Sequence, residues 1–175
     1  MRDIAVLSPI VPEGAAISQA YLRFRPARYP EDAALIRSFW EDAWRAVHGN
    51  LDTFDAVGLL SETERLAASV PGSVVFAMLG DREAGLLVLD TMHLPLNSGH
   101  IFFFTLHPDF RGRHLAVQLL GQAVSFCRKL GRRRLTLRVA GTNIRALSFY
   151  EINGFSPVIG APPDRRGLLT FGMDI

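Results

Sequence analysis

The chain has 175 residues, of which 49% are apolar and 21% charged, and its net charge is +2. These values are typical of one globular domain with a sizeable core, and they exclude a disordered or collagen-like chain. The small net charge also argues against a nucleic-acid-binding protein, although basic residues gather over 128–134. Those residues follow a predicted helix end, where cations stabilise the helix dipole.

No segment approaches the roughly 18 consecutive apolar residues that a membrane-spanning helix needs, so no membrane partner is predicted. Residues 1–20 show little pattern and make a poor signal peptide, so we expect an N-terminal extension and a cytoplasmic protein. Cys127 is the only cysteine, which excludes an internal disulfide and fits a reducing compartment. It lies in an apolar helical pattern that favours a buried side chain over a nucleophile. No spacing of His, Cys and Asp indicates a metal site.

From Tyr21 onward, apolar periodicity and turn residues predict alternating strands and helices. Pro30 and Asp32 mark a helix start, and Gly49 marks its end. The stretch HIFFFTL is apolar throughout, which indicates a buried central strand. The predicted elements are a strand at 21–25, helices at 30–49 and 53–69, strands at 73–79, 85–92 and 100–106, a helix at 114–130, a strand at 134–140, a helix at 143–152, and strands at 155–159 and 168–174.

This order, β-α-α-β-β-β-α-β-α-β-β, has no internal repeat and no linker. We therefore expect a single α/β (α+β) domain over 21–175 with a mixed central sheet flanked by helices.

The junction at Arg111–Ala116, RGRHLA, joins a predicted strand to a predicted helix. Free amides and the dipole at a helix N-terminus form an anion site, and Gly112 permits close approach of the backbone. Arg111 and Arg113 add charge, and arginine can bind phosphate through two parallel hydrogen bonds. The alternative interpretation is an ordinary helix start with surface arginines.

Two motifs in this arrangement resemble the GNAT superfamily of acyl-CoA-dependent N-acyltransferases. The pyrophosphate loop of that family, Arg/Gln-x-x-Gly-x-Gly/Ala, is similar to Arg111–Ala116, with His114 in place of the middle glycine. We expect the His114 amide to remain a donor while its imidazole points away. A second family signature, Asn-x-x-Ala-x-x-x-Tyr followed by Gly-Phe, matches Asn143, Ala146, Tyr150, Gly154 and Phe155.

The resemblance covers Tyr21 to the C-terminus and implies a mostly antiparallel sheet and acetyl-CoA as co-substrate, with no metal. It implies that the fourth strand carries a bulge and splays from the fifth, exposing strand amides to the pantetheine arm. The implied CoA-binding residues are Phe104, Thr105, Leu106, Arg111, Gly112, Arg113, His114, Leu115, Ala116, Asn143, Ala146 and Tyr150.

Two residues are candidates for the chemistry. By resemblance, Tyr150 is the general acid or the hydrogen-bond donor to the leaving thiolate. The alternative is a tyrosine packed beside Phe149. His100, at the head of the fourth strand, is a candidate base, because imidazole titrates near neutral pH. The alternative for His100 is a surface histidine.

The acceptor pocket of the family is built largely by the first two helices and the last hairpin. The acids and aromatics of the two helices would suit a cationic amine, although two tryptophans at i,i+4 spacing also suit a core. These residues are Trp40, Glu41, Asp42, Trp44, Asp52 and Asp55.

The resemblance thus implies an N-acetyltransferase that moves an acetyl group from acetyl-CoA to a primary amine of a small molecule or protein. The predicted mechanism is direct attack in a ternary complex, because no accessible thiol is expected. The alternative is a non-catalytic acyl-CoA-binding sensor or interaction module of the same fold. Homodimers are common in the family, but nothing in this sequence demonstrates one.

Overall fold

A computed structural model of the chain describes residues 21–92, 97–164 and 166–175. The predicted extension over residues 1–20 lies outside the described residues. Within them the predicted order of strands and helices is confirmed, with one short 3-10 helix, η1, in addition. The elements are β1 (Arg23–Pro26), α1 (Ala33–His48), α2 (Ala56–Ser69), β2 (Val74–Leu79), β3 (Arg82–Asp90), β4 (Ser98–Leu106), η1 (Pro108–Phe110), α3 (Leu115–Lys129), β5 (Arg134–Ala140), α4 (Ile144–Ile152), β6 (Ser156–Pro157) and β7 (Leu168–Asp174).

The strands form one seven-stranded sheet in the order β1-β2-β3-β4-β5-β7-β6. Every pair of neighbours is antiparallel except β4 and β5, which run parallel. The predicted mixed, mostly antiparallel sheet is therefore confirmed. The single parallel pair requires a long crossover, and α3 supplies it.

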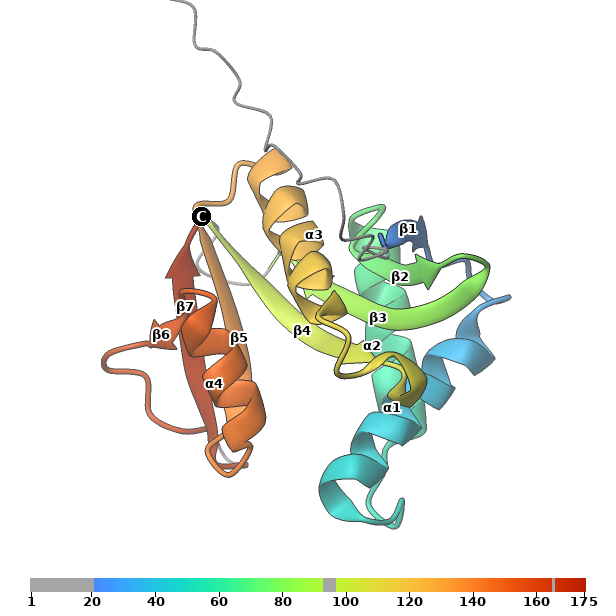
Figure 1. Cartoon of the computed structure of the whole chain (residues 1–175), viewed down its shortest axis with the longest axis horizontal. Coiled ribbons are helices and arrows are strands. Elements are labelled where there is room, and N and C mark those ends of the chain that lie inside the picture. Colours follow the sequence, from blue (N-terminus) through green and yellow to red (C-terminus); the bar gives the residue numbers. More distant parts are fainter. Residues whose placement is uncertain (1–20, 93–96, 165) are drawn as a thin grey trace, which may run out of the picture.

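The parallel pair stays together over only part of its length. Ser98–Ile101 pairs with Arg134–Leu137, and β4 has no partner strand on this edge beyond Ile101. On its other edge, β4 carries a bulge, because Val88 pairs with Phe103 whereas Leu89 pairs with Ile101. The extra residue adds local twist, so β4 and β5 diverge from their paired ends near the C-terminus (Figure 1). The predicted bulge and splay are both present.

Helices cover both faces of the sheet and bury two apolar clusters. On one face, α3 packs Leu115, Leu119 and Ala123 against the sheet, and α4 adds Tyr150. On the opposite face, α1 and α2 bury a second cluster; its helical members are Ile36, Phe39, Trp40 and Leu66. The α1 positions recur three and four residues apart, as an amphipathic helix requires.

Local interactions fix the start and end of α1. Gly49 adopts a left-handed φ of 78°, and its N–H donates to the Arg45 carbonyl at 2.8 Å. At the start, the Asp32 carboxylate accepts 2.7 Å hydrogen bonds from the Arg28 N–H and from the Arg25 guanidinium. This pairing holds the pKa of Asp32 below its usual value, chiefly through the Arg25 hydrogen bond.

Cys127 is fully buried on α3, as the apolar pattern predicted. Burial raises the pKa of its thiol to about 11, so it stays protonated and is no nucleophile at neutral pH. Its sulfur lies against Gly99 of β4, where a side-chain Cβ would overlap it.

Candidate active site

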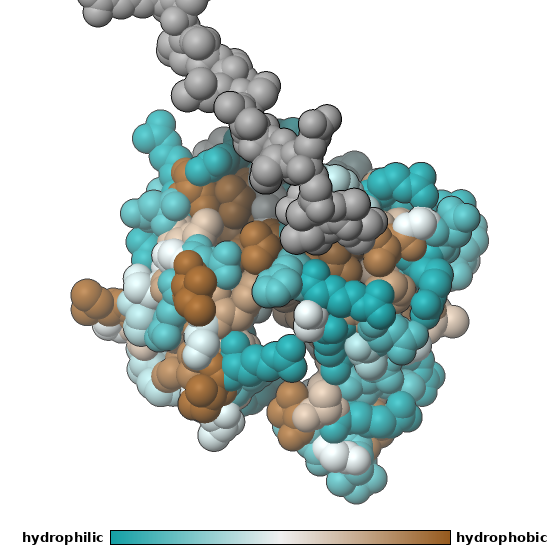
Figure 2. All heavy atoms as spheres, in the orientation of Figure 1, coloured by the Kyte–Doolittle hydropathy of each residue, from teal (hydrophilic) through white to brown (hydrophobic). Residues whose placement is uncertain are grey.

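The splay of the sheet opens a cleft with a volume of about 990 Å³. Figure 2 shows the molecule hollowed where Figure 1 places α4 opposite the loop before α3, with hydrophilic side chains along the border. The cleft is lined by Ala46, Val47, Phe104, Thr105, Leu106, Arg111, Gly112, His114, Leu115, Ala116, Val117, Ala140, Thr142, Asn143, Arg145, Ala146, Phe149, Tyr150, Ile152 and Asn153. Every residue predicted to bind CoA except Arg113 is among them.

The first turn of α3 presents unbonded amides to this cleft. Within the described ranges, the N–H groups of Gly112 through Val117 donate no hydrogen bond to the protein. Such amides carry the positive end of the helix dipole and bind anions well. The turn therefore has the geometry expected of a diphosphate site.

His114 explains why the related motif has a glycine at this position. It is the N-cap of α3 and adopts a left-handed conformation with a φ of 58°, while Gly112 has a φ of 75°. The position thus demands a positive φ, which glycine adopts without steric cost. Histidine is one of the few other residues enriched in that conformation, so the loop keeps its shape with a side chain present.

Two strand amides on β4 also point into the cleft. The His107 N–H donates to the Ala84 carbonyl at 2.9 Å, so the amide of this residue faces β3. Hydrogen bonding alternates along an antiparallel pair, which directs the Thr105 amide towards β3 and the amides of Phe104 and Leu106 away from it. The amides of Phe104, Thr105 and Leu106 were predicted to face the ligand. The Thr105 N–H faces β3 instead, so this residue lines the cleft only through its side chain.

Tyr150 lies in the last turn of α4, and its ring packs in a cluster of aromatic side chains. Ring centroids of Phe104, Phe149 and Phe155 lie 6.1, 5.3 and 5.5 Å from that of Tyr150. Burial raises the pKa of Tyr150 to about 12, so its hydroxyl remains protonated throughout the neutral range. The ring packs beside Phe149, as the alternative interpretation expected, and the residue also lines the cleft.

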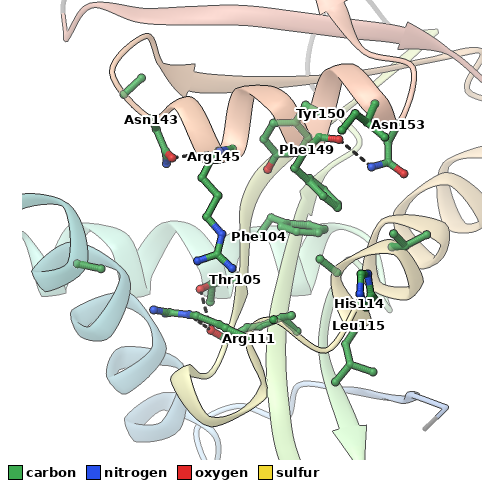
Figure 3. Close-up of a pocket in the computed structure, with 18 of the residues that line it drawn as sticks. Phe104, Thr105, Arg111, His114, Leu115, Asn143, Arg145, Phe149, Tyr150 and Asn153 are labelled. Carbon is green, nitrogen blue, oxygen red and sulfur yellow. Dashed lines mark hydrogen bonds between the residues drawn. The ribbon is translucent and has the colours of Figure 1, made fainter. Parts of the chain in front are cut away.

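Asn143 and Ala146 shape the start of α4. The Asn143 Oδ1 accepts a hydrogen bond from the Ala146 N–H at 3.1 Å, which makes Asn143 the N-cap of the helix. At the other end, the Asn153 side chain donates to the Phe149 carbonyl at 2.7 Å (Figure 3). These contacts fix the helix that carries Tyr150.

The side chains of two predicted site residues lie away from the cleft. The Arg113 guanidinium sits over the Phe110 ring, 5.7 Å from its centroid. His100 lies in the paired part of β4 and is 8% exposed, with Nδ1 at 2.9 Å from the Thr136 Oγ1. The register places it at the closed end of the gap, so the structure does not bring this imidazole to the cleft.

The acids and tryptophans considered for the acceptor do not line the cleft either. Glu41 accepts a 2.7 Å hydrogen bond from Arg37, and Asp55 caps α2 through the Gly58 N–H. Trp40 stacks on Phe103 with ring centroids 3.6 Å apart. It is therefore a core residue, which was the alternative that the spacing of the two tryptophans left open.

Sequence reasoning missed several lining residues. Arg145 and Phe149 lie inside the predicted motif helix, so the periodicity of that helix could have identified them. Ala46 and Val47 come from the end of α1, which reaches the cleft only through tertiary packing. No local signal marks such residues.

The comparisons with known proteins agree with this geometry. A family model described as the acetyltransferase (GNAT) family matches residues 20–155. The chain belongs to this family. The match confirms the predicted family and class of enzyme, and it contains the α3 turn, the splayed strands and Tyr150.

Curated relatives match over shorter regions. A mycothiol acetyltransferase of Beutenbergia cavernae is 32% identical over 87 residues, which is 49% of this chain and 29% of that protein. An uncharacterised N-acetyltransferase of Methanocaldococcus jannaschii is 42% identical over 48 residues, 27% of this chain and 21% of its own length. The chain thus spans under a third of each curated relative.

Solved structures share the fold at low identity. A PaiA N-acetyltransferase from Thermoplasma acidophilum, in complex with coenzyme A, superposes with a TM-score of 0.69 at 17% identity, covering 89% of this chain and 99% of that one. A GNAT-family acetyltransferase from Staphylococcus aureus Mu50 gives a TM-score of 0.73 at 15% identity, covering 88% and 99%.

The described residues contain no group of three or more His, Cys, Asp or Glu side chains placed to hold a metal ion. In the same ranges, no helix has the length and apolar character to cross a membrane.

Proposed function

We propose that the protein is an N-acetyltransferase that uses acetyl-CoA to acetylate a primary amine. The observation that carries the proposal is one cleft that joins an unbonded helix N-terminus, an open strand edge and a protonated tyrosine. Each part has a counterpart in the donor: an anionic diphosphate, an amide-bearing arm and a thioester sulfur.

The residues of the cleft fit coenzyme A in their chemistry. The amides of Gly112 through Val117 would bind the diphosphate. The outward amides of Phe104 and Leu106 would pair with the pantetheine amides, as an added strand does. A cleft of about 990 Å³ is large enough for a ligand of this kind.

In the proposed reaction, the amine nitrogen attacks the thioester carbonyl carbon within a ternary complex. A C–N bond forms, the carbonyl oxygen becomes anionic, and a strand amide of β4 stabilises that charge. The C–S bond then breaks, the Tyr150 hydroxyl donates its proton to the leaving thiolate, and the resulting phenolate regains a proton from water. The buried thiol of Cys127 offers no covalent route.

The proton of the attacking amine leaves to water in this scheme. His100 was a candidate base, but it lies outside the cleft, and no Asp or Glu is among the described lining residues. The acceptor must therefore arrive as the neutral amine, and the rate should rise with pH until the acceptor is deprotonated.

Calorimetric titration with acetyl-CoA tests the donor site. Wild-type protein should bind with micromolar affinity. Gly112→Asp adds a negative charge at the diphosphate site, and Asp tolerates a left-handed φ better than most residues, so this variant should bind at least roughly tenfold more weakly. Gly121→Asp makes the same change on an exposed face of α3 and should bind like wild type.

Release of free thiol on addition of amines then tests transfer. If all three proteins bind acetyl-CoA equally well, the diphosphate does not bind at the first turn of α3. Binding without transfer to any amine would support the non-catalytic acyl-CoA-binding alternative instead.

A further inference from the structure

Residues 108–114, which we call the donor loop, connect β4 to the first turn of α3. The N–H groups of Phe110 and Arg111 close the η1 turn at its start, but the amides from Gly112 onward donate to no described residue. Gly112 and His114 also have positive φ values of 75° and 58°, which a free chain adopts rarely outside glycine. A loop that keeps its amides for a ligand must be held in place by its side chains.

Arg82, the first residue of β3, reaches the donor loop and makes two contacts with it. Its guanidinium donates a hydrogen bond to the Asp109 carboxylate at 2.7 Å and lies over the Phe110 ring, 4.7 Å from the ring centroid. The Phe110 ring is 4% exposed and also carries the Arg113 guanidinium, at 5.7 Å. Arg82 therefore ties the turn between β2 and β3 to the part of the loop directly before the open amides.

Asp109 is an acid only three residues before Gly112, where the amides assigned to the diphosphate begin. The Arg82 hydrogen bond holds the pKa of Asp109 below its usual value, and the charge of Arg113 acts in the same direction. The carboxylate is therefore ionised at neutral pH, and its charge would repel a bound anion. Charge alone gives no reason for an acid at this position, whereas the contact with Arg82 does.

We propose that Arg82 and Asp109 are positioning residues for the donor, whose ion pair holds the donor loop in the conformation that presents its amides to the diphosphate. This inference rests on the proposed function. Neither side chain lines the cleft, so both act through the loop. A ligand that needs one conformation binds more weakly in proportion to the fraction of molecules that have left it. Because the two side chains are 64% and 54% exposed, loss of the pair should weaken donor binding by roughly three- to tenfold.

Two substitutions, measured by calorimetric titration with acetyl-CoA, separate positioning from charge. Arg82→Gln removes a positive charge and Asp109→Asn a negative one, so charge alone would weaken binding in the first variant and strengthen it in the second. Loss of the loop anchor should instead raise the Kd of both by roughly three- to tenfold. The double variant should bind no more weakly than Arg82→Gln, because the pair acts as a unit. Arg82→Lys keeps the charge that both contacts need and should restore most of the affinity.

A second exposed pair provides matched controls. On α2, Arg65 donates to the Glu62 carboxylate at 2.6 Å, and neither residue lines the cleft. Arg65→Gln and Glu62→Gln make the same two changes of charge and should bind acetyl-CoA like wild type. All four single variants should melt within about 3 °C of wild type, because exposed ion pairs contribute little to stability.

Trypsin cleavage of the native protein after Arg111 and Arg113 gives a readout that needs no ligand. Arg82→Gln and Asp109→Asn should be cut at these sites at least roughly threefold faster than the two α2 controls, because the open population of the loop rises. The proposal is overturned if Asp109→Asn binds acetyl-CoA as tightly as wild type or more tightly, or if both variants are cut at the control rate. Failure of the wild-type protein to bind acetyl-CoA would refute the proposed function instead, and the cleavage rates would still decide whether the pair holds the loop.

Discussion

Replacing His114 by glycine should stabilise the protein without weakening the donor site. A left-handed conformation costs a residue with a Cβ roughly 1–2 kcal/mol, and His114 has a φ of 58°. Glycine removes this cost but adds about 0.5–1 kcal/mol of backbone entropy to the unfolded chain. The midpoints of these ranges leave a net gain of about 0.75 kcal/mol, which corresponds to a melting temperature about 1.5–3 °C higher for a domain of this size.

Thermal and urea unfolding of three variants measures this effect. His114→Ala keeps the conformational cost and removes the imidazole, so it should unfold close to wild type. His114→Val adds a β-branch that suits this conformation poorly, and it should be less stable than His114→Ala by about 1 kcal/mol or more. Acetyl-CoA affinity should change less than roughly threefold in the glycine and alanine variants, because main-chain amides form the site.

Two results would refute this reasoning. A glycine variant that is less stable than wild type would mean that the His114 imidazole makes a stabilising contact larger than the conformational cost. A loss of acetyl-CoA affinity in both the glycine and alanine variants would mean that the imidazole itself binds the donor.

Three further substitutions test the cleft and the core. Tyr150→Phe should lower kcat by a factor of about 10²–10⁴, with stability within about 1 kcal/mol of wild type. A kcat above roughly a tenth of the wild-type value would exclude Tyr150 as the acid. Because burial raises the pKa of Tyr150 to about 12, wild-type activity should not decline between about pH 8 and pH 10 through loss of this proton. Asp32→Asn should cost about 2–3 kcal/mol in urea unfolding at neutral pH. Its partner Arg25 holds the folded pKa of Asp32 low, so the carboxylate stabilises above its unfolded pKa, and this advantage over the variant should vanish as the pH falls below about 4; a constant difference down to pH 2 would contradict this. Gly99→Ala should lower the free energy of unfolding by about 1–3 kcal/mol, because the new Cβ meets the Cys127 sulfur. The double variant with Cys127→Ala should recover most of this loss. If Gly99→Ala alone is as stable as wild type, the sulfur moves aside freely.

The order of elements could be predicted because most segments have a strong period and clear ends. The strands at Arg134–Ala140 and Leu168–Asp174 have the predicted bounds, and Gly49 closes α1 as its position indicated. Errors are confined to ends: β3 begins at Arg82 instead of Gly85, because the tight turn needs fewer residues than its composition suggested. Local signals determine local structure, and they are sufficient here.

The site was only partly predictable because its details depend on tertiary structure. Which β4 amides face the cleft follows from the pairing with β3, and the placement of His100 follows from where β4 and β5 separate. Neither can be read from spacing along the chain. Arg113 illustrates the same limit, since its charge suits phosphate but the Phe110 ring holds it elsewhere.

The open edge of β4 gives the cleft a signature in hydrogen exchange. Up to Ile101 both edges of the strand have a partner, so exchange should be slow along this part. Beyond it only the β3 side is bonded, so the amides of Phe103 and Thr105 should exchange slowly and those of Phe104 and Leu106 quickly. A bound donor would slow the second pair and leave the first unchanged. Exchange rates at alternate residues of one strand would therefore report occupancy of the cleft without a label on the ligand.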